Sequence, residues 1–241
     1  MPAGARPNMT PEDAGVDLTA DQPRAFVLEN SSLRPVPLVP EIRLHLADDA
    51  FKVWEESERK LSEGTGDGIE LPPPFWAFAW PGGQALARYV LDHREVVAGR
   101  SVLDLGSGSG LVAIASALAG ASSVLASEVD PFAAAAIELN AAANSVRVRV
   151  IGDVLESPEA ERECGADVVL AADVWYERKL ADRTFTLLQR AGGHGAAVLI
   201  GDIGRAFLPR TALRELAAYD VPVLAELENT SVKRTLILTL A

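Results

Sequence analysis

Cysteine and histidine are scarce in this 241-residue sequence. Cys164 is the only cysteine, and the three histidines, His45, His93 and His194, are scattered without helical ligand spacing. An internal disulfide needs two cysteines, and a structural zinc site needs several cysteine or histidine ligands. The sequence therefore excludes the disulfide, and we expect no metal site.

Basic charge is also in deficit. Lysine and arginine total 22 against 34 aspartates and glutamates, a formal net charge of −12. A field of that sign repels phosphate backbones, so we expect no nucleic-acid partner. It suits a basic partner or a cationic side chain, although surplus carboxylates more often only keep a protein soluble.

Signals for secretion or membrane insertion are missing. The first 25 residues have no apolar h-region. The uncharged stretch Leu105–Ser127 approaches membrane-span length, but its four glycines and six serines do not suit a helix facing lipid. We interpret it as a turn, a buried helix and a strand, and expect a cytoplasmic protein without a membrane partner.

Strand and helix patterns alternate regularly after residue 100. Apolar runs predict strands at 101–105, 124–127, 146–151, 167–171 and 196–201, and helices at 111–118, 130–143, 180–190 and 209–218. Two last apolar runs, 221–227 and 235–240, are close enough to pair as an antiparallel hairpin. The pattern predicts a doubly wound, Rossmann-like α/β fold: a seven-stranded mixed sheet with helices on both faces and a C-terminal antiparallel hairpin.

The first third of the chain is less regular. We predict a flexible leader over 1–24, irregular segments over 26–47 because of Pro35, Pro37 and Pro40, a helix over 48–61, and a loop over 62–74. Residues 25–241 would form one domain, in which an N-terminal extension, 25–83, packs on the core.

A glycine-rich loop joins the strand at 101–105 to the following helix. Gly106, Gly108 and Gly110 allow a sharp turn and a close approach by a ligand. A dinucleotide fingerprint needs its third glycine at position 111, which is Leu, so a nicotinamide oxidoreductase is disfavoured. Asp104 stands two residues before the first glycine, where a carboxylate can orient the loop amides or meet a cationic ligand. We predict a ligand site over Asp104–Gly110, including Ser107.

Acidic residues also follow the next strands. Glu128 ends the strand at 124–127, where a carboxylate can take both hydroxyls of a ribose, whereas Asp130 precedes Pro131 and suits a helix N-cap. We therefore prefer Glu128 as the ribose ligand. Asp153 could accept from an adenine amine or be an ordinary loop residue.

Asp173-Val-Trp-Tyr-Glu177 follows the strand at 167–171, at the edge where open α/β sheets bind ligands. Carboxylates and aromatic rings there can receive a cationic amine. Alternatively, Asp173 caps the next helix and Trp175 belongs to the core.

Aromatic residues, scarce elsewhere, gather in Phe75-Trp-Ala-Phe-Ala-Trp-Pro-Gly-Gly83. This aromatic segment could close over a ligand through Trp80 and wall a substrate channel through Trp76. For Phe75 and Phe78, packing beneath the sheet is the preferred reading.

With these motifs, the sequence resembles the seven-β-strand protein methyltransferases, and within them the electron-transfer flavoprotein β-subunit lysine methyltransferases. The resemblance covers most of the chain after residue 25, through Leu38–Ala47, Pro72–Tyr89, Val102–Ala113, Asp130–Ala133, Asn140–Asn144, Asp173–Glu177 and Gly201-Asp202. Glu156–Cys164 matches nothing in the family.

The resemblance implies S-adenosyl-L-methionine as cofactor and lysine side chains of a protein as substrate. Its cofactor contacts fall on Asp104, Gly106, Gly108, Glu128 and Trp80, although the family usually has Asp where this sequence has Glu128. The D-x-x-Y signature near the target lysine falls on Asp173 and Tyr176, the predicted catalytic residues.

We expect Asp173 to orient the lysine amine, with proton loss to water or to Asp173, and to border the cofactor. Trp175, Glu177 and Trp76 would contact the substrate. Two alternatives stay open: a small-molecule N- or O-methyltransferase, and a non-catalytic adenosyl-binding module.

Overall fold

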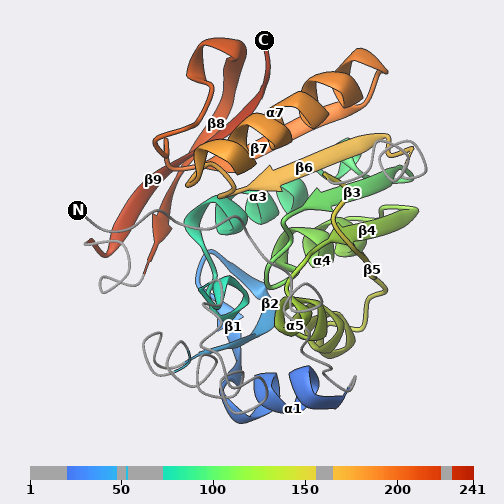
Figure 1. Ribbon diagram of the computed structural model, residues 1–241, viewed down its shortest axis with the longest axis vertical. Helices are drawn as coiled ribbons and strands as arrows, with labels where there is room; N and C mark the ends of the chain where they lie inside the picture. The colour runs from blue at the N-terminus through green and yellow to red at the C-terminus, as the bar shows by residue number, and fades with distance from the viewer. Residues whose placement is uncertain (1–20, 48–52, 54–72, 156–164, 224–229) are drawn as a thin grey trace.

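The computed structural model describes residues 21–47, 53, 73–155, 165–223 and 230–241. Its centre is a seven-stranded mixed sheet in the order β5-β4-β3-β6-β7-β9-β8 (Figure 1). Five strands are parallel, and β8 and β9 form an antiparallel hairpin that joins the edge of β7. The strands are β3 Ser101–Leu105, β4 Ser123–Ser127, β5 Arg149–Ile151, β6 Val168–Ala172, β7 Ala197–Asp202, β8 Leu213–Pro222 and β9 Val232–Leu240.

Helices cover both faces of the sheet, as the doubly wound prediction requires. Successive residues of β3 point to opposite faces: Val102 packs in a cluster with Ile114 and Ile137, and Leu103 packs in a second cluster with Leu187. The first cluster lies under three helices and the second under one. These are α3 Pro81–Asp92, α4 Leu111–Leu118 and α5 Pro131–Ala143 on the first face, and α7 Arg178–Gly193 on the second.

The predicted boundaries hold well in the parallel part. β3 and α4 have the predicted ranges, β4, β6 and β7 differ by one residue, and β5 begins three residues later than predicted. Asp130 is the N-cap of α5, with its Oδ1 accepting from the Phe132 amide at 2.8 Å. The apolar runs and the cap signal were strong enough locally to be read from sequence.

The helix predicted over 209–218 is wrong. Only Arg210–Ala212 is helical, as one 3-10 turn, and the chain then forms β8, which pairs with β9 from Leu213↔Leu240 to Pro222↔Val232. The run Leu-Arg-Glu-Leu-Ala-Ala has helix-forming composition, but a long antiparallel partner outweighs that weak local preference. The hairpin is confirmed, with its first strand displaced from the predicted 221–227, whose last residues lie outside the described ranges.

The N-terminal extension is more ordered than predicted. Helix α1, Asp21–Glu29, begins inside the predicted leader, and the segment expected to be irregular forms an antiparallel pair, β1 Ser32–Val36 and β2 Val39–Leu46. The pair accommodates its prolines because Pro35 lies at a register shift and Pro37 in the connecting turn. Residues 1–20, nearly all of the helix predicted over 48–61 and most of the loop predicted over 62–74 lie outside the described residues.

Two asparagines, Asn140 in α5 and Asn144 at its C-cap, attach the β1–β2 pair to this helix. Asn140 is fully buried; its Oδ1 accepts from the His45 amide at 2.7 Å, and its Nδ2 donates to the Ser109 carbonyl in the glycine loop at 2.8 Å. Asn144 Oδ1 accepts from the Arg43 amide at 2.9 Å. The glycine loop and β2 are therefore held by the same side chain.

Helix α3 begins in direct contact with β7 and the end of β6. A Cβ added to Gly82 would stand 2.3 Å from the Gly201 carbonyl oxygen and 2.5 Å from Asp173 Oδ2. At Gly83, the next residue, a Cβ would meet only Leu111 Cδ2, at 3.8 Å.

We therefore expect Gly82→Ala to destabilise the protein by about 2 kcal/mol or more, because the helix must move away from the sheet. Gly83→Ala is the matched control and should change the free energy of unfolding by less than about 1 kcal/mol. Urea unfolding of both variants measures the difference, and equal stabilities would contradict this packing.

Candidate active site

The glycine-rich loop lies between β3 and α4, at the carboxyl edge of the parallel strands. Gly106, Gly108 and Gly110 all have left-handed backbones, with φ of 59°, 55° and 81°. A Cβ at Gly106 would stand 3.1 Å from Val174, and one at Gly110 would stand 3.3 Å from Ile137. Side chains are therefore disfavoured here by both conformation and space.

Asp104 holds this loop from beneath. Its buried carboxylate accepts from the Ser107 hydroxyl at 2.6 Å and from the Ala113 amide, in the first turn of α4, at 3.1 Å. Of the two roles that the sequence left open for Asp104, the geometry supports the orientation of the loop. Burial raises the pKa of Asp104 to about 7, against the opposing effect of its two hydrogen bonds.

Glu128 reaches the same loop from the end of β4. Its Oε2 accepts from the Gly108 amide at 2.8 Å, and its Oε1 accepts from the amides of Val129 at 2.8 Å and Asp130 at 3.2 Å. A carboxylate has about four lone-pair sites, so Glu128 can accept from a further donor. Glu128 is thus placed beside the glycine loop, while Asp130 caps α5, as the sequence reasoning distinguished them.

Three acids at this edge have raised pKa values. Burial is the main cause for Asp104, Glu128 and Asp130, and the charge of Glu128 adds to the rise for each of the other two. The pKa of Asp130 rises to about 7. Because burial and mutual repulsion disfavour the charged forms, a cationic ligand would stabilise this cluster of carboxylates.

Asp153 lies further along the same edge, after β5. Its Oδ1 accepts from the Leu155 amide at 2.7 Å, and its Oδ2 is 3.6 Å from Arg183 Nη2 on α7. The first contact closes a local turn, and the second pairs the carboxylate with an opposite charge, as for an ordinary acidic residue in a loop. Its role as an adenine ligand stays a prediction.

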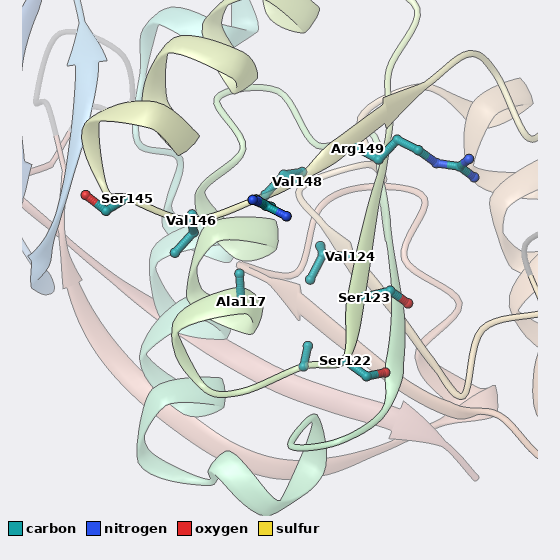
Figure 2. Close-up of a pocket in the computed structure, with 10 residues that line it drawn as sticks. Ala117, Ser122, Ser123, Val124, Ser145, Val146, Val148 and Arg149 are labelled. Atoms are coloured by element: carbon teal, nitrogen blue, oxygen red, sulfur yellow. The ribbon is translucent and has the colours of Figure 1, made fainter.

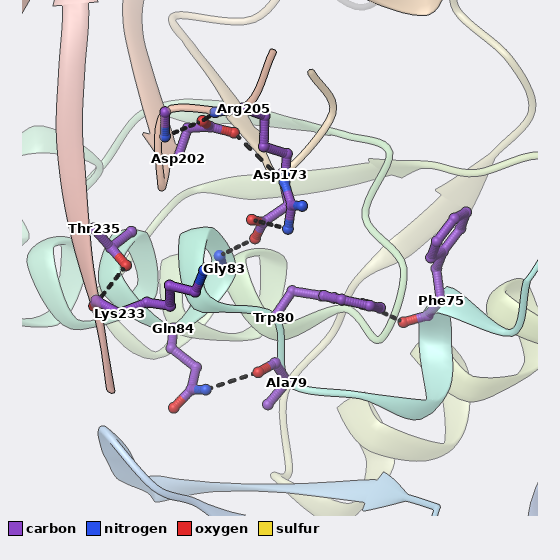
Figure 3. A network of polar contacts seen from close by, with 11 residues as sticks. Phe75, Ala79, Trp80, Gly83, Gln84, Asp173, Asp202, Arg205, Lys233 and Thr235 are labelled. Carbon is purple, nitrogen blue, oxygen red and sulfur yellow. Dashed lines mark hydrogen bonds and ion pairs between the residues drawn. The ribbon is translucent and has the colours of Figure 1, made fainter. Parts of the chain in front are cut away.

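Asp173 follows β6, on the other side of the glycine loop. Its backbone is left-handed, with φ of 58°, and its amide donates to the Gly201 carbonyl at 3.1 Å. Its Oδ2 accepts from the Gly83 amide at 2.9 Å, and its Oδ1 pairs with Arg205 Nη2 at 2.9 Å (Figure 3). The alternative in which Asp173 caps α7 is not what forms, since Glu177 holds that N-cap position.

The charge state of Asp173 is set by opposing effects. Burial raises its pKa to about 6, the Arg205 guanidinium lowers it, and the nearby Asp202 carboxylate raises it. Asp173 is therefore ionised at neutral pH and loses its charge in mildly acidic solution.

Aromatic rings of the segment Phe75–Gly83 contact Tyr176, the last residue of the D-x-x-Y signature. Phe75 packs against Trp80 with ring centroids 5.9 Å apart and against Tyr176 at 5.1 Å, and Trp80 Nε1 donates to the Phe75 carbonyl at 2.8 Å. Tyr176 is 43% exposed, and burial of its hydroxyl together with the charge of Glu128 raises its pKa to about 12. The tyrosine therefore stays protonated, beside both the aromatic segment and Glu128.

The structure corrects two predicted substrate contacts. Trp175 is fully buried in the cluster of Leu187 and Leu188, and Trp76 is buried against Phe26 with ring centroids 6.4 Å apart. Both indoles are core residues, because large apolar groups gain the most free energy from burial. Glu177 is exposed, and its contact with a substrate stays a prediction.

Sequence reasoning also missed two residues of the site. Phe75 was assigned to the core, yet it is half-buried and contacts both Trp80 and Tyr176. Arg205 was not identified at all, although it follows the Gly201-Asp202 pair at the end of β7. Its place, at the carboxyl end of a parallel strand, was the signal that could have found it.

A separate pocket lies at the opposite end of the strands, around the starts of β4 and β5 (Figure 2). It is lined by serines and small apolar residues, with Arg147 and Arg149 beside it. None of the site residues above contributes to it. Over the residues that the structure describes, no group of histidine, cysteine and acidic side chains could hold a metal ion, and no helix has the length and apolarity to cross a membrane.

Comparison with known proteins agrees with this geometry. The family model described as "Ribosomal protein L11 methyltransferase (PrmA)" matches residues 84–198, which include the glycine loop and Asp173. This match, together with the Rossmann-like mixed sheet and the glycine loop after its first parallel strand, indicates a methyltransferase.

More extensive similarity identifies the family. The chain is 38% identical over 216 residues to "Electron transfer flavoprotein beta subunit lysine methyltransferase" of Danio rerio, covering 87% of this chain and 80% of that protein. It is 39% identical over 184 residues to the protein of the same name in Homo sapiens, covering 76% and 66%. The chain belongs to the electron-transfer flavoprotein β-subunit lysine methyltransferase family, which confirms the resemblance seen in its motifs.

Proposed function

We propose that this enzyme uses S-adenosyl-L-methionine to methylate lysine side chains of a protein, the electron-transfer flavoprotein β subunit. Family membership supports the substrate. The observation that carries the proposal is the arrangement of the carboxyl edge: the glycine loop follows β3, Glu128 follows the neighbouring β4 and bonds to the loop, and Asp173 follows β6 on the other side of β3.

The residues present fit the proposed cofactor. Gly106 and Gly108 have left-handed backbones and no side chains, so a ligand can approach the loop backbone closely. The Glu128 carboxylate accepts from the Gly108 amide there. The raised pKa values of Asp104, Glu128 and Asp130 mark a place where positive charge is favourable. Glu128 would take the ribose hydroxyls, and the glycine loop, oriented by Asp104, would hold the amino-acid part.

When bound, S-adenosyl-L-methionine supplies a methyl group on a positively charged sulfur. The protein's own contribution is to place a lysine amine in line with it and to exclude water. A lysine ammonium, with an ordinary pKa near 10.4, must first lose a proton, which would pass to water or to Asp173. Asp173 would accept a hydrogen bond from the amine through lone pairs that Gly83 and Arg205 leave available, and the rings of Tyr176 and Phe75 would wall its path.

Label transfer distinguishes this function from a small-molecule methyltransferase. The protein is incubated with S-adenosyl-L-methionine labelled in its methyl group and a lysate of the source organism. We expect label in a protein band at the size of the electron-transfer flavoprotein β subunit, on lysine after acid hydrolysis. Label found only in small molecules would favour the alternative enzyme, and cofactor binding without any transfer would favour a non-catalytic module.

Cofactor affinity should depend on pH because of the raised pKa values. In the free protein burial raises the pKa values of Asp104 and Asp130 to about 7, so both are mostly protonated at pH 6 and mostly ionised at pH 8. A cationic ligand binds their charged forms better, so binding releases protons and tightens as pH rises. We expect S-adenosyl-L-methionine to bind about tenfold more tightly at pH 8 than at pH 6.

Calorimetric titration in two buffers of different ionisation heat measures both the affinity and the proton release. S-adenosylhomocysteine, which lacks the sulfonium charge, is the matched control and should show a smaller change with pH. An affinity for the cationic cofactor that is independent of pH over this range would contradict the assignment of the carboxylates.

We also propose a cytoplasmic location. The single cysteine, Cys164, leaves the chain without the internal disulfides that stabilise many secreted proteins. Fractionation of the source organism with an antibody against the protein tests this, and recovery in a membrane or secreted fraction would contradict it.

A further inference from the structure

The Arg205 guanidinium lies between two acids at the edge of the proposed site (Figure 3). Its Nη2 is 2.9 Å from Asp173 Oδ1, and its Nε is 3.8 Å from Asp202 Oδ2. The Arg205 Cζ also lies 5.8 Å from the centre of the Trp80 ring, within the range of a cation–π contact. A single side chain from the loop after β7 thus contacts both Asp173 and the aromatic segment.

The loop itself is built to hold Arg205 in this place. The fully buried Asp202 accepts from the backbone amides of Gly204 at 2.6 Å and Arg205 at 2.7 Å. Gly204 has a left-handed backbone, with φ of 88°, and its carbonyl accepts from Arg210 Nη2 at 2.7 Å. These contacts fix the backbone from which the Arg205 side chain reaches Asp173, so only side-chain freedom remains to be lost when the two groups meet.

Together with the Gly83 amide, Arg205 fixes both oxygens of Asp173. Oδ2 is held by the start of α3 and Oδ1 by Arg205, so the carboxylate plane has one orientation. The charged groups that face Asp173 are Arg205 and, from the end of β7, Asp202; α3 presents a backbone amide there. Arg205 opposes the effects of burial and of Asp202, both of which disfavour the charged carboxylate.

We propose that Arg205 is a positioning residue of this methyltransferase, which acts through Asp173 by holding its carboxylate charged and in the orientation that receives the lysine amine. The inference rests on the proposed function of Asp173. It assigns to Arg205 no contact with the substrate. It predicts that loss of Arg205 lowers kcat most in mildly acidic solution, where Asp173 is most easily protonated.

The test compares Arg205→Gln with the wild-type enzyme at two pH values, with the purified electron-transfer flavoprotein β subunit of the same organism as substrate. Without the guanidinium, the pKa of Asp173 rises further, so the variant loses its charged carboxylate first in mildly acidic solution. We expect the ratio of wild-type to variant kcat to be at least about fivefold larger at about pH 6.5 than at about pH 9. Both enzymes act on the same substrate lysine, so its titration affects both kcat values equally and cancels in their ratio.

Arg214→Gln is the matched control, because it removes an arginine whose side chain is exposed on β8, outside the loop that holds Arg205. Its kcat ratio to wild type should be the same at both pH values. Affinity for S-adenosylhomocysteine should change less than about threefold in either variant. A ratio for Arg205→Gln that does not vary with pH would show a merely structural role and overturn the proposal.

A double variant keeps the proposal testable if Arg205→Gln does not fold. Asp173→Asn with Arg205→Gln removes both charges of the pair, so no partner is left buried and uncompensated. If Arg205 acts through Asp173, the double variant and Asp173→Asn alone should have the same kcat within about twofold. A further loss of about tenfold in the double variant would show that Arg205 acts independently of Asp173. Failure of the wild-type enzyme to methylate the substrate would instead count against the proposed function.

Discussion

Replacing Asp173 by Asn is expected to lower kcat by about 100-fold or more while affinity for S-adenosylhomocysteine changes less than about threefold. Asn preserves the size of the side chain and an acceptor for the Gly83 amide, but it removes the negative charge that faces Arg205 and, in the proposed mechanism, the incoming amine. The charge matters most at the moment the amine is placed for attack, so the loss appears in turnover. Steady-state kinetics and calorimetry on the same protein measure the two quantities.

Asp167→Asn is the matched control for this variant. Asp167 directly precedes β6, the strand that Asp173 follows, and it is exposed and bonded to Ser101. It should leave kcat within about twofold of wild type. A loss of cofactor affinity as large as the loss of turnover in Asp173→Asn would contradict the assignment of Asp173 to the substrate side of the site.

Glu128→Gln should show the opposite pattern. The Glu128 carboxylate accepts from three backbone amides, of Gly108, Val129 and Asp130, and would also accept from the cofactor ribose. Gln replaces one acceptor oxygen with a donor and removes the charge. At about 1.5–3 kcal/mol for the one charged hydrogen bond that is lost, affinity for S-adenosylhomocysteine should fall about 10- to 150-fold.

At saturating cofactor, the kcat of Glu128→Gln should stay within about fivefold of wild type, since uniform binding of substrate and transition state affects affinity alone. Glu138→Gln, on the exposed face of α5, is the matched control and should behave as wild type. Unchanged affinity in Glu128→Gln would remove Glu128 from the cofactor site and leave the ribose without an assigned acceptor.

The parallel half of the fold was predictable because its signals are local. Buried parallel strands give continuous apolar runs, and the left-handed glycines of the loop and the N-cap at Asp130 leave direct marks in the sequence. The strand β8 was not predictable from its own residues, because Leu213–Ala218 has helical composition and becomes a strand only through its partner β9.

The site was predictable to the extent that its residues follow strand ends. Glu128 and Asp173 were predicted in this way. In the structure Glu128 accepts from the Gly108 amide of the glycine loop, and Asp173 follows β6, which lies next to β3 in the sheet. The aromatic residues were harder, since composition does not show which ring is buried: Trp175 is fully buried, whereas its neighbour Tyr176 is exposed and contacts Phe75. Arg205 is 32 residues from Asp173 in sequence, and a contact over that distance has no local signal.

The proposal that the enzyme methylates a lysine of the electron-transfer flavoprotein β subunit is tested most directly by mass spectrometry of that subunit. The purified subunit is incubated with the enzyme and S-adenosyl-L-methionine, and its peptides are then sequenced. We predict a mass increase in whole methyl steps, located on lysine and reduced by about 100-fold in rate with Asp173→Asn. An unmodified subunit, under conditions in which the same enzyme preparation binds S-adenosylhomocysteine, would contradict the proposed substrate.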